Sequence, residues 1–159
     1  MRRINAILKN NIFTDILNNI EKAEKTRIYC RHGIDHLFDT ARICYIINLE
    51  NGYGFDKEII YAAALLHDIG RYEEYKNNIS HNEASGKIAD EILFKCGFSE
   101  LEKKIIVEAI FSHREIKEDI SLGALLYKGD KLSRKCFFCE AEDKCYWSED
   151  KKNFGINLY

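Results

Sequence analysis

The chain has 159 residues, 46% of them hydrophobic, so it is long enough to bury one core and too short for two ordinary domains. Its 24 basic and 26 acidic residues are interspersed and give a formal net charge of −2, so no basic face favours nucleic acid as a partner. No apolar run approaches the roughly 20 residues that a membrane span needs, and the N-terminus lacks the apolar stretch of a secretory signal. We therefore expect a cytoplasmic protein with no membrane partner.

The pattern of apolar residues predicts an all-α fold. Proline is absent, glycines cluster between stretches with helical apolar spacing, and strand-like alternation is nowhere sustained. Asp56, Ser80 and Ser99 are expected helix N-caps, and the two serines each have a glutamate three residues later, as in a capping box. In chain order, the expected helices cover about residues 11–25, 32–49, 56–66, 80–97, 99–113 and 121–134.

The third of these helices ends in two residues of metal-ligand type. It is apolar nearly all round from Ile59 to Leu66, so we expect it at the centre of the bundle, and His67 and Asp68 follow directly. An unsatisfied buried polar group costs about 1–3 kcal/mol and an uncompensated charge costs more, so both side chains need a partner. A divalent cation is such a partner. The alternative is that His67 is satisfied within the core and that Asp68 caps the following turn.

Three motifs in a fixed order carry a resemblance to a known family. They are His36 with Ala41 and Arg42 after it, the run 63–71 around His67 and Asp68, and the run 126–132 around Asp130. Over about residues 28–135 the chain resembles the HD-domain metal-dependent phosphohydrolases. The resemblance implies a single compact helical bundle in which His36, His67, Asp68 and Asp130 bind one metal ion.

Two further histidines extend the resemblance to a narrower group. In HD proteins with two metals, histidines in the positions of His81 and His113 bind the second ion, and the aspartate in the position of Asp68 bridges. The chain looks like the small dinuclear diadenosine tetraphosphate hydrolases of bacteria, in which a di-iron centre is typical. The resemblance implies one or two divalent ions, which could be iron, manganese, nickel, cobalt or magnesium. Alternatively, His81 merely begins a helix and His113 binds substrate phosphate.

Three more residues have expected roles beside this site. His32 lies four residues before His36 and could replace it as a ligand or support it from behind, although the small residue Ala41 five positions after His36 favours His36. Arg71 and Lys131 are expected catalytic residues that offset charge on a phosphate, while Asp68 orients or bridges the attacking water. The alternative for Arg71 is an exposed arginine at a helix end.

The C-terminal tail has a cysteine pattern of its own. Cys136, Cys139 and Cys145 give C-x2-C-x5-C in a segment with little core, where a metal ion could supply order. We expect Cys30 as the fourth ligand, with His32, Cys44 and Cys96 as alternatives. Zinc and an iron–sulfur cluster both suit the ligands, and the spacing resembles that of the cluster in some RecB-type nucleases. Alternatively, these thiols pack as buried apolar groups with the tail's aromatic residues, Phe137, Phe138, Tyr146 and Trp147.

Together these patterns predict an HD-type helical domain over residues 1–135 and a cysteine- and aromatic-rich tail over 136–159 that packs on it. The predicted function is metal-dependent hydrolysis of a nucleotide or related phosphate ester by metal-activated water. A small phosphorylated, nucleotide-like molecule is the expected partner, and a dinucleoside polyphosphate is one candidate. The alternatives are a non-catalytic metal- or nucleotide-binding sensor and a di-iron, oxygenase-like HD protein.

Overall fold

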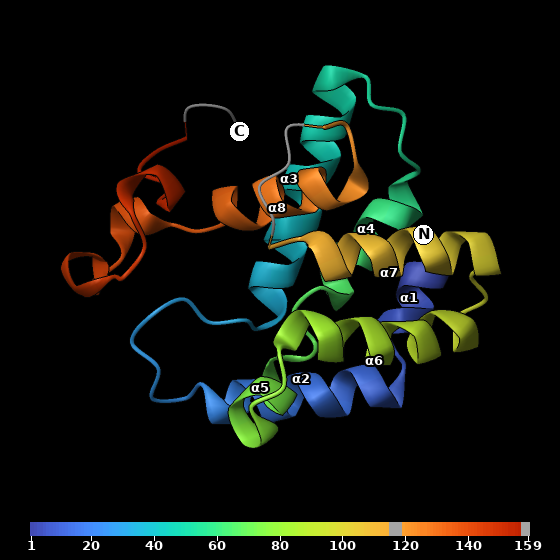
Figure 1. Ribbon diagram of the computed structural model, residues 1–159, viewed down its shortest axis with the longest axis horizontal. Coiled ribbons are helices and arrows are strands. Elements are labelled where there is room, and N and C mark those ends of the chain that lie inside the picture. The colour runs from blue at the N-terminus through green and yellow to red at the C-terminus, as the bar shows by residue number, and fades with distance from the viewer. Residues whose placement is uncertain (115–118, 157–159) are drawn as a thin grey trace.

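The computed structural model describes residues 1–114 and 119–156, and within them the regular structure is entirely helical (Figure 1). The α-helices are α1 (Arg2–Leu8), α2 (Asn11–Ala23), α3 (Ile34–Asn51), α4 (Lys57–Leu66), α5 (Arg71–Asn77), α6 (His81–Lys95), α7 (Glu100–Ser112) and α8 (Leu122–Leu132). Three single-turn 3-10 helices follow in the tail: η1 (Cys136–Phe138), η2 (Glu142–Lys144) and η3 (Glu149–Lys151). Within the described residues, no helix is long and apolar enough to span a membrane.

The all-α prediction is confirmed, and each of the six expected helices is present as α2, α3, α4, α6, α7 or α8. Two seven-residue helices, α1 and α5, escaped sequence analysis because so short a segment completes only two turns of apolar periodicity. Tertiary contacts hold α1, since Arg3 pairs with Glu58 of α4 and Glu102 of α7. The helix expected from His32 begins instead at Ile34, behind Gly33, so His32 lies in the preceding loop.

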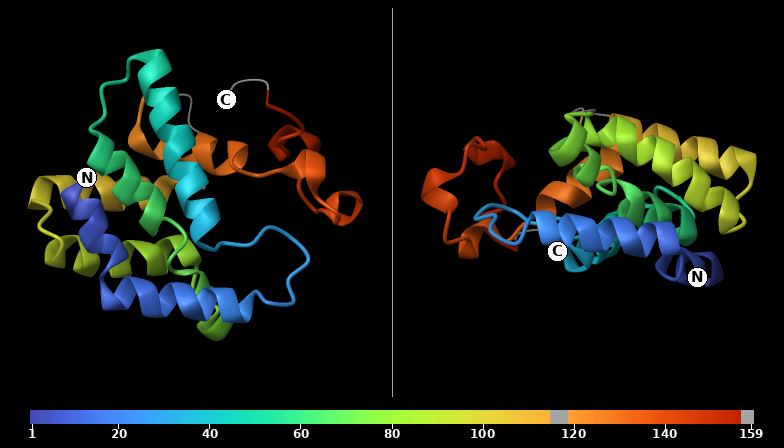
Figure 2. Two further views of the ribbon diagram at one scale, coloured as in Figure 1. Left: turned by 180° about the vertical axis from the view of Figure 1, so that it is seen from behind. Right: turned by 90° about the horizontal axis from the view of Figure 1, so that it is seen from below.

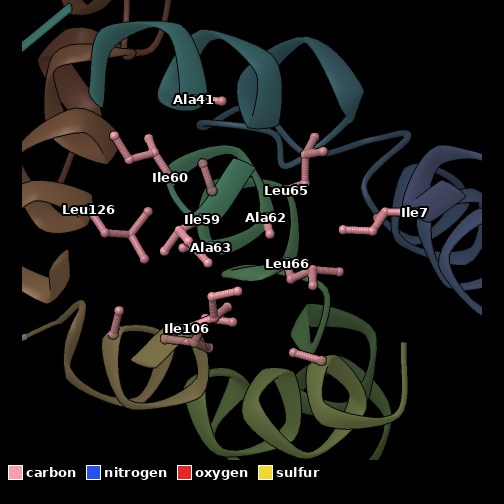
Figure 3. Packing of buried hydrophobic residues seen from close by; sticks show 14 of the residues in the cluster. Ile7, Ala41, Ile59, Ile60, Ala62, Ala63, Leu65, Leu66, Ile106 and Leu126 are labelled. Atoms are coloured by element: carbon pink, nitrogen blue, oxygen red, sulfur yellow. The ribbon is translucent and has the colours of Figure 1, made fainter. Parts of the chain in front are cut away.

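Helix α4 is the centre of the bundle, as its apolar sequence predicted. It contacts α1, α3, α6, α7 and α8, and its residues from Ala62 to Leu66 are fully buried. Figure 3 shows Ala41 of α3, Leu126 of α8 and Ile106 of α7 on different sides of it. Because α4 is fixed on all sides, the two residues that follow it, His67 and Asp68, are carried into the interior with both side chains buried.

The predicted caps form at two of the three positions. The Asp56 carboxylate accepts from two backbone N–H groups at the start of α4, and Ser99 and Glu102 make the full capping box of α7. The capping box predicted at Ser80 is wrong, because the Ser80 hydroxyl donates to Asn82 and makes no bond to the α6 backbone. Helix α6 begins at the predicted place without it.

Two glycines permit close helix contacts beside the buried polar residues. A Cβ on Gly70 would lie 2.3 Å from the His81 carbonyl oxygen and 2.4 Å from the Ser85 backbone nitrogen. A Cβ on Gly129 would lie 2.2 Å from Cys44 Sγ, where α8 crosses α3. The absence of a side chain at these positions lets α6 approach the end of α4, and lets α8 bring Asp130 against α3.

The tail leaves the bundle at the end of α8 and lies beside the loop that joins α2 to α3 (Figures 1 and 2). Asn153 donates to the carbonyl oxygens of Leu132 and Arg134, which fixes the return of the tail to the end of α8. The Tyr29 and Tyr146 rings meet edge to face at 6.0 Å. These contacts tie the tail to the helical bundle through few side chains.

Candidate metal centre

The structure brings together all six residues that were predicted as metal ligands, from five different elements. His36 lies on α3, His67 and Asp68 end α4, His81 begins α6, His113 ends α7 and Asp130 lies on α8. Every one of these side chains is buried. The site therefore lies where α3, α4, α6, α7 and α8 meet.

The imidazoles share one orientation, because each Nδ1 atom is engaged away from the centre of the site. His67 Nδ1 lies 2.7 Å from the Ala64 carbonyl oxygen, and His113 Nδ1 lies 2.5 Å from that of Ile110. These carbonyl oxygens accept from Nδ1–H. The Nε2 atom of each ring is therefore the one that can offer a lone pair to a metal ion.

Side chains hold the other two rings in the same way. His36 Nδ1 lies 3.0 Å from the Ser133 hydroxyl, which itself donates to the Asp130 carbonyl oxygen. His81 Nδ1 lies 3.0 Å from a Glu74 carboxylate oxygen. A partner on the far nitrogen fixes the tautomer and the direction of a metal-binding histidine, so the four rings are pre-oriented for a shared centre.

The donor atoms fall into two sets that share Asp68. One set consists of His36, His67, Asp68 and Asp130, and the other of Asp68, His81 and His113; within each, the donor atoms lie within 4.8 Å of one another. Asp68 Oδ2 faces the first set, 3.5 Å from His36 Nε2 and 3.2 Å from His67 Nε2. Asp68 Oδ1 faces the second, 3.4 Å from His81 Nε2. This is the arrangement of a carboxylate that can bridge two ions.

The residues present fit a bound cation. His67 Nε2 and His81 Nε2 are buried without any hydrogen-bond partner among the described residues, although both point toward the carboxylates. A buried nitrogen that makes no hydrogen bond costs about 1–3 kcal/mol, and an ion in each donor set would satisfy the nitrogen that the set contains. The donor chemistry, imidazole with carboxylate, suits divalent transition metals.

The protonation states of three histidines suit metal binding. Burial and the Arg134 guanidinium lower the pKa of His36 to about 3, and burial and the charge on His67 lower the pKa of His113 to about 4. Burial also lowers the pKa of His81. These three imidazoles are therefore neutral at pH 7 and offer a lone pair.

His67 and the two aspartates carry the opposing charges. Burial disfavours charge on His67, but Asp68 and Asp130 outweigh it and raise the pKa of His67 to about 9. Burial alone would raise the pKa of Asp68, yet Arg71 and His67 hold it well below its usual range. Arg134 and His67 do the same for the pKa of Asp130. Two ionised carboxylates thus lie in the interior, where they favour a cation.

Comparison with models of known protein families identifies the family to which this chain belongs. The model of the family described as HD domain matches residues 33–141, which is more than half of the chain. The chain belongs to the HD-domain family. Members of this superfamily are generally metal-dependent phosphohydrolases, and the matched segment contains all six clustered residues.

A relative covers nearly the whole of this HD protein. A protein of Clostridium beijerinckii, described as "Uncharacterized protein", is 43% identical over 156 residues, which make up 98% of this chain and 99% of the relative. No solved structure matches the chain significantly. The family assignment therefore rests on the HD domain match, which supplies no substrate.

The cations predicted as catalytic residues of the HD domain lie beside its carboxylates. Arg71 Nε donates to Asp68 Oδ1 at 3.0 Å, and Lys131 Nζ lies 2.7 Å from Asp130 Oδ2. The structure thus places both at the edge of the site. In addition, Arg134 Nη2 lies 2.8 Å from His36 Nε2 and 3.1 Å from Asp130 Oδ1. A metal ion bound by those two atoms would have to displace this guanidinium.

His32 belongs to a chain of polar contacts that ends at Asp68. Its Nδ1 lies 2.5 Å from a Glu24 carboxylate oxygen, which also accepts from the Tyr75 hydroxyl at 2.5 Å. Its Nε2 lies 3.8 Å from Asp68 Oδ2. Glu24 thereby orients His32 as Glu74 orients His81, but His32 lies outside the two compact donor sets. This geometry suits a residue that helps to position Asp68 better than it suits a metal ligand.

The four cysteines predicted as ligands also converge. Cys30, from the loop before α3, lines one cavity of about 300 Å³ together with Cys136, Cys139 and Cys145 of the tail. Cys44 and Cys96 were the cysteine alternatives to Cys30 as the fourth ligand. Cys44 is buried at the contact of α3 with α8, where its Sγ faces the Leu125 carbonyl oxygen at 3.4 Å. Cys96 is the C-terminal cap of α6. Neither lines this cavity.

Sequence reasoning missed the residues that support the ligands. Ser133 and Arg134 follow Asp130 by one helical turn, so helical spacing alone could have placed them near His36. Glu24 and Glu74 gave no such signal, because each lies on the other side of an irregular connection from its histidine, where helical spacing does not apply.

Proposed function

We propose that this HD domain is a metal-dependent phosphohydrolase that acts on a nucleotide or related phosphate ester with water as the nucleophile. The observation that carries the proposal is the pair of compact donor sets that share Asp68, with the Nε2 atoms of His67 and His81 buried and without partners. Two adjacent cation sites occur in many enzymes that catalyse displacement reactions at phosphorus.

The ligands of the proposed centre are His36, His67, Asp68 and Asp130 in one half, with His81 and His113 completing the other half around Asp68. Divalent ions held there would lower the pKa of a water molecule and draw charge from the phosphoryl oxygens. The protein supplies the fixed frame, since the rings are oriented through Nδ1 and the carboxylates are held ionised in the interior.

The cations at the edge of the site have a second role in this proposal. Arg71 and Lys131 pair with Asp68 and Asp130. Each can also offset negative charge on a phosphate that binds beside its carboxylate, and the planar guanidinium of Arg71 suits two phosphate oxygens at once. We propose these two as catalytic residues together with Asp68, which orients the attacking water.

A nucleotide is the substrate class that the surroundings of Lys131 support. Its ammonium lies 4.3 Å from the centre of the Trp147 ring and 5.3 Å from that of Tyr127, and both rings are partly exposed. Aromatic faces next to a phosphate-binding cation offer a surface on which a base can stack. A dinucleoside polyphosphate, with a base at each end of a phosphate chain, is one candidate in this class.

The test is an assay of protein from which metal has been stripped. Activity toward a panel of nucleoside polyphosphates, dinucleoside polyphosphates and simple phosphodiesters should be lost on stripping and regained with one of manganese, iron, cobalt, nickel or magnesium. Asp68→Asn should lower turnover about a thousandfold or more, because it weakens both halves of the centre. Asp15→Asn, which changes an exposed carboxylate on α2, is the matched control and should behave as wild type.

Two results would contradict the proposal. Nucleotide binding without product across the whole panel would favour a sensor. Oxygen-dependent oxidation of a substrate, in place of hydrolysis, would favour an oxygenase-like di-iron protein.

A further inference from the structure

Four thiols from two distant parts of the chain meet where the tail joins the HD domain. Cys30 lies in the loop between α2 and α3, and Cys136, Cys139 and Cys145 lie in the tail that folds back beside that loop (Figure 2). All four line one cavity of about 300 Å³. They are distinct from the ligands of the histidine–carboxylate centre, although His36 also borders the cavity.

The tail has too little apolar burial to hold this arrangement by itself. Among residues 136–156, Cys136 and Ala141 are the buried hydrophobic residues, and Phe138 and Tyr146 are 86% and 74% exposed. The helices η1, η2 and η3 have three residues each and carry few backbone bonds. A segment of this kind gains its order from a link other than a core, and a metal centre is the usual one when four thiols converge.

The thiols are neighbours but are spread more widely than a single ion requires. A zinc ion holds thiolates at about 2.3 Å, so four tetrahedral sulfurs lie about 3.8 Å apart. Among the described residues, no set of three potential ligands within 4.8 Å of one another contains a cysteine. Thiolates that bind different irons of a cluster lie farther apart than those on one ion, and the cavity leaves room for the additional atoms.

A buried hydrogen-bond donor borders the same cavity. Arg134, which is 6% exposed, has an Nε–H without a partner among the described residues, while its Nη1 donates to the Arg31 carbonyl oxygen. Its charge opposes the effect of burial, which raises the pKa of the Cys30 thiol. A buried cation with an unused donor is suited to an anionic cluster whose sulfurs accept hydrogen bonds.

We propose that Cys30, Cys136, Cys139 and Cys145 bind an iron–sulfur cluster of the [2Fe–2S] or [4Fe–4S] type, which fastens the tail to the HD domain beside Arg134. The cluster is separate from the proposed hydrolytic centre and does not depend on that function. Its role in the fold is to join the loop before α3 to the tail.

The test is analysis of the full chain after purification without oxygen. Acid-labile sulfide should be present with at least one iron per sulfide, any further iron being held by the histidine–carboxylate centre, and a broad visible absorption should bleach on reduction. Cys139→Ser should lose the sulfide and the visible absorption. Cys96→Ser changes a thiol at the end of α6 and should retain both.

The wild-type measurement decides the proposal even if a variant fails to fold. Zinc without sulfide would overturn the cluster, and absence of both metal and sulfide from the wild type would overturn the site. Retention of full sulfide in Cys139→Ser would also overturn the assignment. Asp68→Asn should keep its sulfide whether or not it hydrolyses phosphate esters, so failure of the hydrolytic function and failure of the cluster are distinguished.

Discussion

The histidine–carboxylate centre and the cysteine site hold their candidate ligands by different means. The first draws its six side chains from five packed elements with α4 at the centre, and hydrogen bonds on the far nitrogens orient its histidines. The second draws four thiols from a loop and a tail of single-turn helices with two buried hydrophobic residues. The packed helices therefore orient the residues of the first centre without a bound metal. In the second centre, the proposed cluster would itself help to order the tail that carries three of the four thiols.

Loss of a tail cysteine should have the largest effect, because it should destabilise the tail and leave the helical bundle unchanged. Cys145→Ser is expected to increase the rate of protease cleavage within residues 136–156 by about a hundredfold or more, because the tail would lose the several kcal/mol that a structural metal centre contributes. Limited proteolysis with mass spectrometry measures this. Helicity of the bundle should stay unchanged, and Asp68→Asn should leave the tail protected. Equal cleavage of wild type and Cys145→Ser would remove the basis of the comparison.

A change at Gly70 should show how tightly the bundle fixes the first centre. Gly70→Ala places a Cβ about 2.3 Å from the His81 carbonyl oxygen, so α6 must shift, and we expect a loss of about 3 kcal/mol in the free energy of unfolding. Thermal unfolding should show this as a drop in Tm of roughly 6–12 °C. Gly97→Ala is a poor control because Gly97 has a positive φ of 79°, so Ser85→Ala, which removes the bond to Gly70 N–H without a clash, is the better comparison and should cost less. A Gly70→Ala protein as stable as wild type would show that the contact is not tight.

The polar chain behind His32 should appear in the pH dependence of stability. Burial alone would raise the pKa of Glu24, but His32 and Tyr75 lower it from 4.5 to about 2. Ionised Glu24 therefore stabilises the folded state by about 3 kcal/mol, fully above pH 4.5, and this contribution is lost as the pH falls toward 2.

Urea unfolding of wild type and Glu24→Gln between pH 3 and 6 checks this directly. The difference between their free energies of unfolding should shrink as the pH falls. A difference that stays constant with pH would show that Glu24 does not titrate in this way.

The smallest expected effect concerns the orientation of one ligand. Glu74→Gln weakens the acceptor on His81 Nδ1 and should reduce metal affinity in the half of the centre that contains His81 and His113 by about 10–100-fold. Metal titration by calorimetry resolves the two halves. The neighbouring residue Glu73 on α5 accepts from Asn77 and does not contact the site. Glu73→Gln should therefore leave the metal affinities of both halves unchanged. Equal losses in both variants would indicate a general effect of charge.

The residues that cluster at the candidate centre could be singled out from the sequence more readily than the residues that orient them. His36, His67, Asp68 and Asp130 lie far apart in the sequence, so their convergence was predicted from the resemblance of three ordered motifs to the HD-domain family and not from local spacing. The Asp56 cap and the capping box of Ser99 and Glu102 are local, and both are confirmed.

Features that depend on contacts across the fold could not be foreseen. Helices α1 and α5 are too short for periodicity and are fixed by their neighbours. The carboxylate of Glu24, at the end of α2, accepts from Tyr75 of α5 and contacts His32 in the following loop. The local signal at Ser80 failed because the Ser80 hydroxyl donates to Asn82.

Anomalous diffraction from crystals of the protein purified without oxygen tests the central claim most directly, because it locates metal atoms and their ligands together. We predict metal within coordination distance of His36 and His67 Nε2 and of Asp68, with a second ion toward His81 and His113 when both halves are filled, and separate iron density among the four cysteines. Metal-loaded crystals without density beside Asp68 would contradict the account of the histidine–carboxylate centre.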